Sequence, residues 1–489
     1  MAEGEPLQLV CVPWPVMGHV QIVELAKLIL RRQNLLPRGK TLSITVLLMK
    51  IPDSIDTVSG SYADLLSSSP SSTPGLHFFQ LPQTDPTPEW SSKTRGYFIH
   101  SLVLSQKSNI SDFLKAHRSN IAGLLVDMLC TSMIRVAEDF GLPAYVFFTS
   151  PASFLGAMLH CQTLHDEQNQ DVPGLKNLKT GIRIPSFEKP VPPEVMSLVL
   201  VDERQWLDRF LHYARDYRRA KGILVNTFTD LETDAIASFS LGSAYGNRPV
   251  PPVYPVGPIL NRGPCLNRPA ALGWLDEQPP GSVLFVCFGS QGSLDEEQVR
   301  ELAVGLERSG TRFLWALRRR SSGSAGFPSE YADYEGVLPE GFLGRTGSKG
   351  RVVGWVPQLE VLENRAVGGF VCHCGWNSVL ESLWCGVPMA TWPLHAEQQM
   401  NAFQLARELG LAVEISLRYR ERGGEDGRLV AAEEIENGIR AVMERGSEVR
   451  RRVVEMRERA RASVSEGGPS WVCLHRFVKE CLTTGDELE

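Results

Sequence analysis

Short hydrophobic runs and amphipathic stretches alternate along most of the chain. Two of these runs, Leu9–Pro13 and Val283–Phe288, are each followed by a glycine-containing loop and then by apolar residues at helical spacing. A repeated order of strand, loop and helix is typical of parallel sheets covered by helices on both faces. The pattern therefore predicts the α/β class, with two Rossmann-like doubly wound parallel-sheet domains that face each other.

A proline-rich stretch separates the two halves. Prolines recur throughout residues 249–270, after the strand-like run GILVNTF and before a new series of strands and helices that starts near Ser282. Because proline interrupts both helices and strands, such a stretch is typical of a linker. We therefore predict a first domain over residues 1–248, a linker over 249–270 and a second domain over 271–469. Residues 470–489 form a terminal segment with apolar side chains at helical spacing.

The segment from Trp355 to Gln398 contains more polar and aromatic residues than a structural core needs. Its short strand-like runs end at Trp355 and at His373, and an apolar helical pattern follows Gly375. In an open parallel sheet, the loops at the carboxyl ends of the strands form the ligand crevice, so these positions should share one mouth. Polar groups buried there without partners would destabilise the fold, and a ligand is the simplest partner.

The residues around this crevice match the parts of a nucleotide that carries a sugar. The run 375–378 begins a helix, whose unpaired backbone N–H groups favour an anion such as a diphosphate. Glu381 lies on the same helical face as Asn377 and Ser378, where its carboxylate can accept hydrogen bonds from ribose hydroxyls. Trp355 offers a ring for stacking on a base. Taken singly, each also fits a plainer interpretation: N-capping for Asn377 and Ser378, a solvated position for Glu381, and half-buried core for Trp355.

A histidine and an aspartate occupy matching positions in the first half. His19 follows the first strand-like run, and Asp127 ends the run GLLV at 123–126, so both belong at the carboxyl edge of the predicted sheet. An acceptor hydroxyl attacks poorly until its proton is being removed, and a histidine oriented by a carboxylate is a suitable general base. Helix capping by His19 and a turn role for Asp127 are the structural alternatives.

The segment from Trp355 to Gln398 as a whole resembles the signature box of the plant secondary-product UDP-glycosyltransferases, which are inverting enzymes of GT-B fold. The box begins at Trp355, continues through HCGWNS at 373–378 and Glu381, and closes at Glu397–Gln398. The resemblance implies that His19 and Asp127 are catalytic. It also implies a donor site, with uracil on Trp355 and the Val356 backbone, ribose on Gln358 and Glu381, diphosphate on Ser290, His373, Asn377 and Ser378, and sugar on Trp376, Glu397 and Gln398.

The same resemblance implies the reaction. In the family, a glutamine at the end of the box, such as Gln398, mostly accompanies glucose as the sugar. The family often has aspartate at the position of Glu397, so the distance between the longer glutamate side chain and the sugar stays open. The expected reaction moves glucose from UDP-glucose to a hydroxyl of a small hydrophobic flavonoid, other phenolic or terpenoid, with inversion to a β-glucoside. Alternatives are a catalytically impaired UDP-sugar-binding relative and a transferase for another UDP-sugar. The acceptor, its regiospecificity, and O- against C-, N- or S-transfer stay open.

Other protein classes lack their sequence signatures. A hydrolase built on Ser290 would need a G-x-S-x-G elbow, and a nicotinamide-dependent oxidoreductase would need the G-x-G-x-x-G fingerprint; neither is present there. For the acceptor site, Phe147, Phe148 and Phe154 suit a flat apolar ligand and equally suit plain core. The segment 470–489 resembles the family's terminal helix, which packs back on the first domain.

Composition sets the expected environment and partners. The formal net charge of −6 argues against a nucleic-acid partner, and without a run of eighteen apolar residues no membrane insertion is expected. Ten scattered cysteines are typical of small buried hydrophobes in a reducing compartment, so we expect a cytosolic protein. We also expect it to act as a monomer. The sequence contains no Asp-x-Asp pair, and Cys372 to Cys374 are spaced too tightly for a metal clamp. We therefore expect no metal and no other cofactor.

Overall fold

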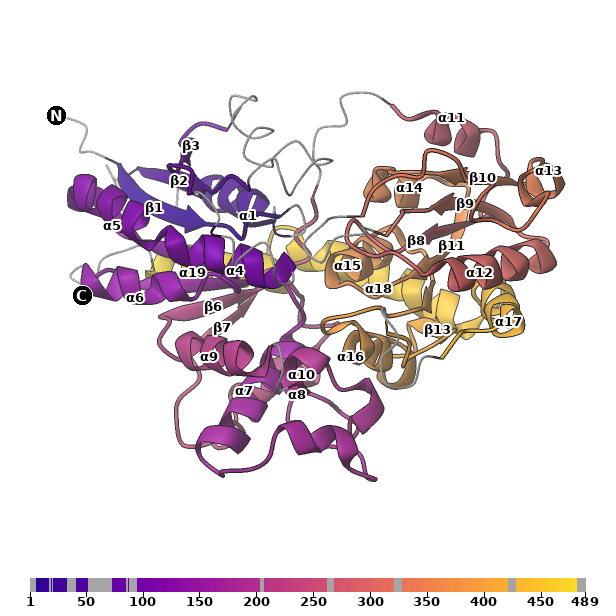
Figure 1. The fold of residues 1–489 in the computed structure, drawn as a ribbon. Coiled ribbons are helices and arrows are strands. Elements are labelled where there is room, and N and C mark those ends of the chain that lie inside the picture. The colour runs from indigo at the N-terminus through magenta and orange to yellow at the C-terminus, as the bar shows by residue number, and fades with distance from the viewer. Residues whose placement is uncertain are drawn as a thin grey trace.

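The chain folds into two α/β lobes, one built mainly from its first half and one from its second (Figure 1). The computed structural model describes residues 6–16, 19, 21–32, 41–51, 73–84, 87, 95–202, 206–261, 268–320, 328–420 and 428–481. Each lobe contains one sheet whose strands all run parallel. This arrangement confirms the predicted fold class. The prediction rested on hydrophobic runs of strand length that are separated by helical patterns throughout both halves.

The first lobe is built around a seven-stranded sheet with the order β3-β2-β1-β4-β5-β6-β7. Successive side chains of a strand point to opposite faces, so Leu9 and Cys11 of β1 lie in one core cluster and Val10 and Val12 lie in another. Both faces of this sheet are therefore buried. Its strands are β1 (Leu7–Val12), β2 (Leu42–Leu48), β3 (Leu76–Gln80), β4 (Ile121–Asp127), β5 (Ala144–Phe148), β6 (Gly222–Val225) and β7 (Val253–Pro255).

Helices cover both faces of the first sheet. Helix α1 (Gln21–Leu30) packs on one face through an apolar stripe that includes Leu25 and Ile29. The other helices of this lobe are α4 (Arg95–Ser105), α5 (Lys107–Ala116), α6 (Ser132–Asp139), α7 (Ala152–Asp166), α8 (Leu198–Val201), α9 (Leu207–Tyr217) and α10 (Thr233–Ser238).

The last helix, α19 (Pro469–Cys481), packs on the first lobe although it follows the second lobe in the chain (Figure 1). The ring of Phe477 lies edge-on to Tyr145, at 5.1 Å between centroids, and to Tyr254, at 5.7 Å. Phe477 is fully buried, so this contact anchors the helix to the sheet. Residues 482–489 of the predicted terminal segment lie outside the described residues.

The second lobe contains a six-stranded sheet with the order β10-β9-β8-β11-β12-β13. Phe285 lies in the core cluster on one face, and Leu284 and Val286 lie in the cluster on the other face. The strands are β8 (Val283–Cys287), β9 (Arg312–Ala316), β10 (Gly350–Val353), β11 (Val367–Cys372), β12 (Met389–Thr391) and β13 (Ala412–Glu414). The helices are α11 (Ala270–Asp276), α12 (Glu296–Ser309), α13 (Phe342–Thr346), α14 (Gln358–Glu363), α15 (Trp376–Cys385), α16 (Gln398–Phe403), α17 (Ala432–Met443) and α18 (Glu448–Val464).

Part of the predicted proline-rich linker is a strand. β7 extends the first sheet parallel to β6, with Ile223 beside Val253. An edge strand tolerates proline because one side of its backbone has no ladder partner. The next helix of the chain begins at Ala270, and residues 262–267 of the predicted linker lie outside the described part of the chain.

The strand order of each sheet creates a crevice at its carboxyl edge. In the first sheet β1 has β2 on one side and β4 on the other, and in the second sheet β8 lies between β9 and β11. Ligands of open parallel sheets bind at such switch points. His19 follows β1 and Asp127 ends β4, while Ser290 follows β8 and His373 follows β11. All four residues therefore lie at a switch point.

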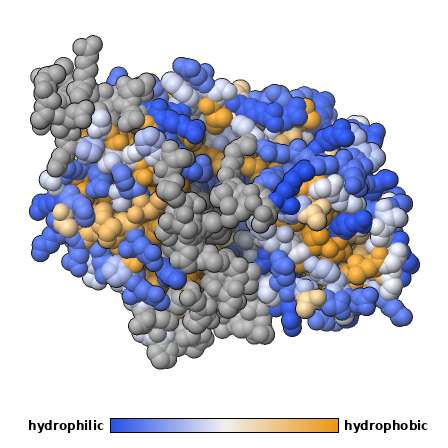
Figure 2. Space-filling model, turned by 90° about the horizontal axis from the view of Figure 1, so that it is seen from above, coloured by the Kyte–Doolittle hydropathy of each residue, from blue (hydrophilic) through white to orange (hydrophobic). Residues whose placement is uncertain are grey.

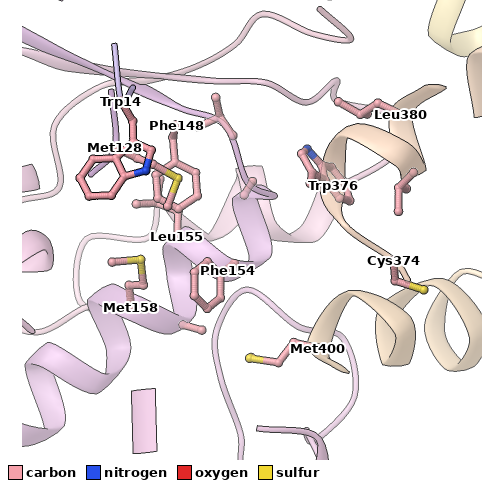
Figure 3. Packing of buried hydrophobic residues seen from close by; sticks show 14 of the residues in the cluster. Trp14, Met128, Phe148, Phe154, Leu155, Met158, Cys374, Trp376, Leu380 and Met400 are labelled. Atoms are coloured by element: carbon pink, nitrogen blue, oxygen red, sulfur yellow. The ribbon is translucent and has the colours of Figure 1, made fainter. Parts of the chain in front are cut away.

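A hydrophobic cluster continues from one lobe into the other. Phe148, Phe154 and Leu155 of the first lobe belong to the same cluster as Trp376 and Leu380 of the second, and Figure 3 shows them on the two sides of the boundary. Seen from above, hydrophilic side chains and smaller groups of hydrophobic ones are mixed over both lobes (Figure 2). Within the described residues, no helix combines the length and the apolar character needed to cross a bilayer.

Candidate active site

A histidine and an aspartate form a hydrogen-bonded pair at the edge of the first sheet. His19 Nδ1 is 2.7 Å from Asp127 Oδ2, and the other carboxylate oxygen accepts the backbone N–H of Leu129 at 2.9 Å. Asp127 is fully buried, whereas the His19 side chain keeps 18% of its surface exposed. A carboxylate held in this way fixes the orientation of the imidazole ring, which leaves Nε2 as the nitrogen that can take up a proton. Residues 17, 18 and 20 lie outside the described chain.

Two loops of the second lobe form a cradle around His373. Gly289 follows β8 with φ of +73°, and a Cβ there would lie 2.7 Å from His373 Nε2. A Cβ on Gly375 would come within 2.4 Å of the same nitrogen. Both contacts are shorter than real Cβ atoms show, so glycine is required beside this ring. Burial, with a contribution from His395, lowers the pKa of His373 to about 3, and the ring is therefore neutral at physiological pH.

Helix α15 begins at this cradle. Gly375 is its N-cap, and Trp376, Asn377 and Ser378 are its first three residues. Immediately before the helix, Cys374 adopts φ of +61°, which is uncommon for a residue other than glycine. Backbone strain of this kind is concentrated at functional sites. The backbone N–H groups at the start of α15, together with the neutral His373, can donate hydrogen bonds to an anion.

Gln358, Ser378 and Glu381 form a hydrogen-bonded group between α14 and α15. Gln358 Nε2 donates to Ser378 Oγ and to Glu381 Oε2, each at 2.7 Å. Burial raises the pKa of Glu381 to about 7, and the bond from Gln358 acts in the opposite direction. Nearby, the Trp355 ring is 57% exposed, although it is large and apolar. An exposed ring beside a carboxylate suits the base and the ribose of a nucleotide.

Three side chains complete the site on the side of the first lobe. Glu397 Oε1 accepts a hydrogen bond from Ser150 Oγ at 3.0 Å. Gln398 Oε1 accepts two backbone N–H groups of the preceding turn, at 2.9 and 3.0 Å. Trp376 Nε1 donates to the carbonyl oxygen of Asn226 at 2.7 Å. Because this indole N–H is engaged, a ligand contact of Trp376 would use its ring face or its backbone.

These groups surround one cavity of about 770 Å³ between the lobes. This volume lies within the range of small-molecule sites. Asp127 lies behind His19 and does not line the cavity. The lining includes His19 and every residue predicted to bind the donor: Ser290, Trp355, Val356, Gln358, His373, Trp376, Asn377, Ser378, Glu381, Glu397 and Gln398.

Known proteins of similar sequence cover nearly the whole chain. Residues 277–443 match the family model described as UDP-glucoronosyl and UDP-glucosyl transferase. A UDP-glucose flavonoid 3-O-glucosyltransferase 6 from Fragaria ananassa is 45% identical, and the match covers 98% of this chain and 99% of that protein. The chain belongs to the UDP-glycosyltransferase family.

Further relatives agree with this assignment. UDP-glycosyltransferase 71A15 from Malus domestica is 44% identical to this UDP-glycosyltransferase over 97% of the chain and 99% of the relative. The crystal structure of Medicago truncatula UGT71G1 with UDP-glucose has a TM-score of 0.84 and 35% identity, covering 98% of this chain and 99% of the other. A transferase from Siraitia grosvenorii in complex with UDP has a TM-score of 0.83 and 42% identity, covering 98% and 100%. The resemblance, the enzyme class and the GT-B fold expected from the sequence are thereby confirmed.

The predicted acceptor residues of this UDP-glycosyltransferase divide between cavity and core. Phe154 lines the cavity. Phe147 lies on the opposite face of the sheet, in the cluster that α19 covers. Phe148 is fully buried, and its ring lies edge-on to Tyr217 at 5.7 Å between centroids. Both residues belong to β5, a central strand covered on both faces, and neither lines the cavity.

The UDP-glycosyltransferase has further cavity residues that the sequence patterns did not indicate. Met128 and Leu129 add apolar surface next to His19, and their position directly after Asp127 is a local signal that could have found them. Phe210 comes from α9, far along the chain, and carries no such signal. Thr149 and Ser150 line the cavity from the turn after β5, where their small polar side chains look like ordinary turn residues.

Proposed function

We propose that this enzyme transfers glucose from UDP-glucose to a hydroxyl of a small hydrophobic acceptor, with inversion to a β-glucoside. One observation carries the proposal: His19, held by Asp127, lines the same cavity as the residues predicted to hold the nucleotide sugar. A base and an activated sugar fixed in one cavity lower the entropic part of the barrier, because an acceptor that binds between them is already oriented.

His19 acts as the general base of a direct displacement. Its Nε2 removes the proton of the acceptor hydroxyl while the acceptor oxygen forms a bond to the anomeric carbon. The bond from that carbon to UDP breaks on the opposite face, and its electron pair leaves with the diphosphate, so an α-linked donor gives a β-linked product. Asp127 stabilises the imidazolium, and the N–H groups at the start of α15 stabilise the charge on the departing UDP.

UDP-glucose is the proposed donor. The Fragaria relative is named for UDP-glucose, and the Medicago structure contains UDP-glucose. The two backbone bonds to Gln398 Oε1 fix the orientation of this amide at the cavity wall, so its amide group has a defined position for sugar hydroxyls. Another UDP-sugar is the alternative donor, and comparing turnover rates with several UDP-sugars distinguishes it from UDP-glucose.

A flavonoid, another phenolic or a terpenoid is the proposed acceptor. Met128, Leu129, Phe154 and Phe210 form an apolar part of the cavity wall, which suits a flat and largely hydrophobic molecule. Two relatives from Fragaria ananassa carry names that specify the 3-position of flavonoids. Phytolacca americana UGT2, whose structure has 33% identity and a TM-score of 0.80, was complexed with pterostilbene.

The reaction needs no metal ion and no other cofactor, and the enzyme acts as a cytosolic monomer. In support, the sequence has no Asp-x-Asp pair, and the described side chains include no cluster of three His, Cys, Asp or Glu residues placed to hold a metal. Eight of the described cysteines have free thiols, as in a reducing compartment. Turnover in EDTA and the mass in light scattering test these two points.

The proposed function is tested by incubating the purified enzyme with UDP-glucose and a panel of flavonoids, simple phenols and terpenoid alcohols. UDP release is measured together with product mass, and the NMR coupling of the anomeric proton gives the linkage. We expect UDP and a β-glucoside in equal amounts. An α-linked product would refute inversion. UDP-glucose would be refuted as the preferred donor by faster turnover with UDP-galactose, UDP-xylose or UDP-glucuronate. UDP binding without turnover on any acceptor would identify a catalytically impaired relative.

A further inference from the structure

The turn after β5 contacts both the base and a residue of the predicted sugar site. Thr149 Oγ1 lies 3.3 Å from His19 Nδ1, next to the shorter bond from Asp127. The following residue, Ser150, donates its hydroxyl to Glu397 Oε1 at 3.0 Å. Both turn residues line the cavity, and Ser150 is 8% exposed. A single turn of the first lobe therefore lies between the proton acceptor and a carboxylate of the second lobe.

The segment around Glu397 is held from the first lobe at a second point. Ala396 adopts φ of +57°, a strained conformation for alanine, and its carbonyl oxygen accepts the hydroxyl of Ser197 at 2.6 Å. Ser197 is fully buried and also belongs to the first lobe. The backbone at position 396 and the carboxylate at position 397 are thus each bound by a serine from across the boundary.

Another serine makes an equivalent bond that does not reach the cavity. Ser153 Oγ donates to Gln404 Oε1 at 3.0 Å, again from the first lobe to the second. Ser153 and Gln404 are both buried, and neither lines the cavity. The two bonds match in the serine donor, in length and in direction across the boundary, although Glu397 accepts with a carboxylate and Gln404 with an amide oxygen. They differ in whether the acceptor group faces the ligand.

We propose that Ser150 is a positioning residue that holds the Glu397 carboxylate in place for the hexose of the donor. This inference rests on the proposed function and names a determinant of its donor selectivity. Glutamate has three side-chain torsions, and its length gives the carboxylate several alternative positions. The Ser150 bond occupies one carboxylate oxygen and selects one position, so the other oxygen meets the sugar hydroxyls at a fixed point.

The consequence is that the acceptor-binding lobe contributes to the choice of sugar. A site that binds a hydroxyl with a fixed group rejects an epimer more strongly than a site whose group can follow the hydroxyl. UDP-galactose differs from UDP-glucose only in the configuration at C4. Without the Ser150 bond, the carboxylate becomes mobile, and the preference for glucose over galactose falls.

The test compares Ser150→Ala with Ser153→Ala as its matched control. Steady-state rates are measured with UDP-glucose and UDP-galactose, and the inhibition constant of UDP is measured separately. We expect Ser150→Ala to raise the KM for UDP-glucose by about tenfold, the loss of roughly one hydrogen bond to a charged group, and to reduce the glucose preference, while UDP inhibition changes by less than about twofold. Ser150→Thr, which keeps the hydroxyl, should restore most of the loss, and Ser153→Ala should keep wild-type values.

Equal effects of Ser150→Ala and Ser153→Ala on KM would overturn the proposal, because both bonds would then act only by holding the lobes together. An unchanged KM in Ser150→Ala would also overturn it. Each change is repeated in a Glu397→Ala background, where Ser150→Ala should have no further effect on the KM for UDP-glucose. Thermal melting of each variant identifies loss of folding. A wild-type enzyme that binds UDP without transferring any sugar would refute the proposed function instead. In that case the dissociation constants of UDP and UDP-glucose, measured by calorimetry, decide whether Ser150→Ala selectively weakens UDP-glucose.

Discussion

Replacing Asp127 by asparagine removes the negative charge of the side chain and keeps its shape nearly unchanged. Asparagine has nearly the same size, and its carbonyl oxygen can still accept the backbone N–H of Leu129, which is 2.9 Å from Asp127 Oδ1. The amide N–H₂ would then face His19 Nδ1, 2.7 Å from the present Oδ2. Nδ1 must become the acceptor of this bond, so the proton of neutral imidazole moves to Nε2. The ring then has no free electron pair toward the acceptor hydroxyl.

The size of the effect follows from the role of the base. A positioned general base contributes about 10²–10⁴ to a rate, equivalent to about 3–5 kcal/mol of the activation barrier. We expect Asp127→Asn to reduce kcat by a factor in this range, with little change in the KM for UDP-glucose, because the donor residues are untouched. Steady-state UDP release with phenols of graded acidity is the assay. The loss should shrink for acidic phenols, since they ionise without help.

Asp216→Asn is the matched control for this experiment. Asp216 is also a fully buried carboxylate of the first lobe, and it accepts the Thr131 hydroxyl at 2.9 Å, but it does not line the cavity. Its replacement should leave kcat within about threefold of wild type. The reasoning is refuted if Asp127→Asn retains wild-type kcat with a weakly acidic phenol, or if both variants lose activity equally while remaining folded by circular dichroism.

Three further changes test the donor half of the cavity. Burial raises the pKa of Glu381 from its usual 4.5 to about 7. Protonated Glu381 therefore stabilises the native state below about pH 4.5, and this stability is lost as the pH rises through about 7. In ligand-free enzyme, Glu381→Gln should gain up to about 3 kcal/mol of folding stability relative to wild type as the pH rises from 5 to 8, read from Tm. Trp355→Ala should raise the Kd of UDP about tenfold or more by calorimetry with little change in Tm, because the ring is 57% exposed. Gly375→Ala places a Cβ 2.4 Å from His373 Nε2 and should weaken UDP binding by at least about tenfold, whereas Gly273→Ala, where a Cβ meets nothing within 4 Å, should bind UDP normally.

The part of the cavity that is predicted to bind the donor could be placed from the sequence because its residues are local. From Trp355 to Gln398 the strand and helix patterns fix which positions follow a strand or start a helix, and those positions face the cavity. Glu381 shares a helical face with Ser378 through spacing alone, and both meet Gln358 in the structure. The same reasoning placed His19 and Asp127 at the carboxyl edge of the first sheet.

The part of the cavity wall proposed to bind the acceptor could not be predicted in the same way, because its residues come from separate elements. Met128, Ser150 and Phe210 follow or lie in three different elements, and no periodic pattern relates them. Aromatic character alone does not distinguish Phe154 at the cavity from Phe147 in the core, since both are apolar and buried. Only the packing of the helices over β5 decides which aromatic side chain faces the ligand.

The hydrogen bonds of the cavity divide the predicted donor site into two parts. One part is bonded within the second lobe, and the other also forms bonds to the first lobe. The group predicted to bind ribose, formed by Gln358, Ser378 and Glu381, is bonded within the second lobe. By contrast, two of the three residues predicted to bind the sugar, Trp376 and Glu397, are bonded to the first lobe, while Gln398 is bonded within the second. Under the proposed function, the second lobe alone therefore binds the uridine end, whereas the hexose is bound by residues that are held from both lobes. Sugar selectivity and acceptor activation then depend on the same boundary between the lobes, so a donor that fits poorly is also held poorly against the base.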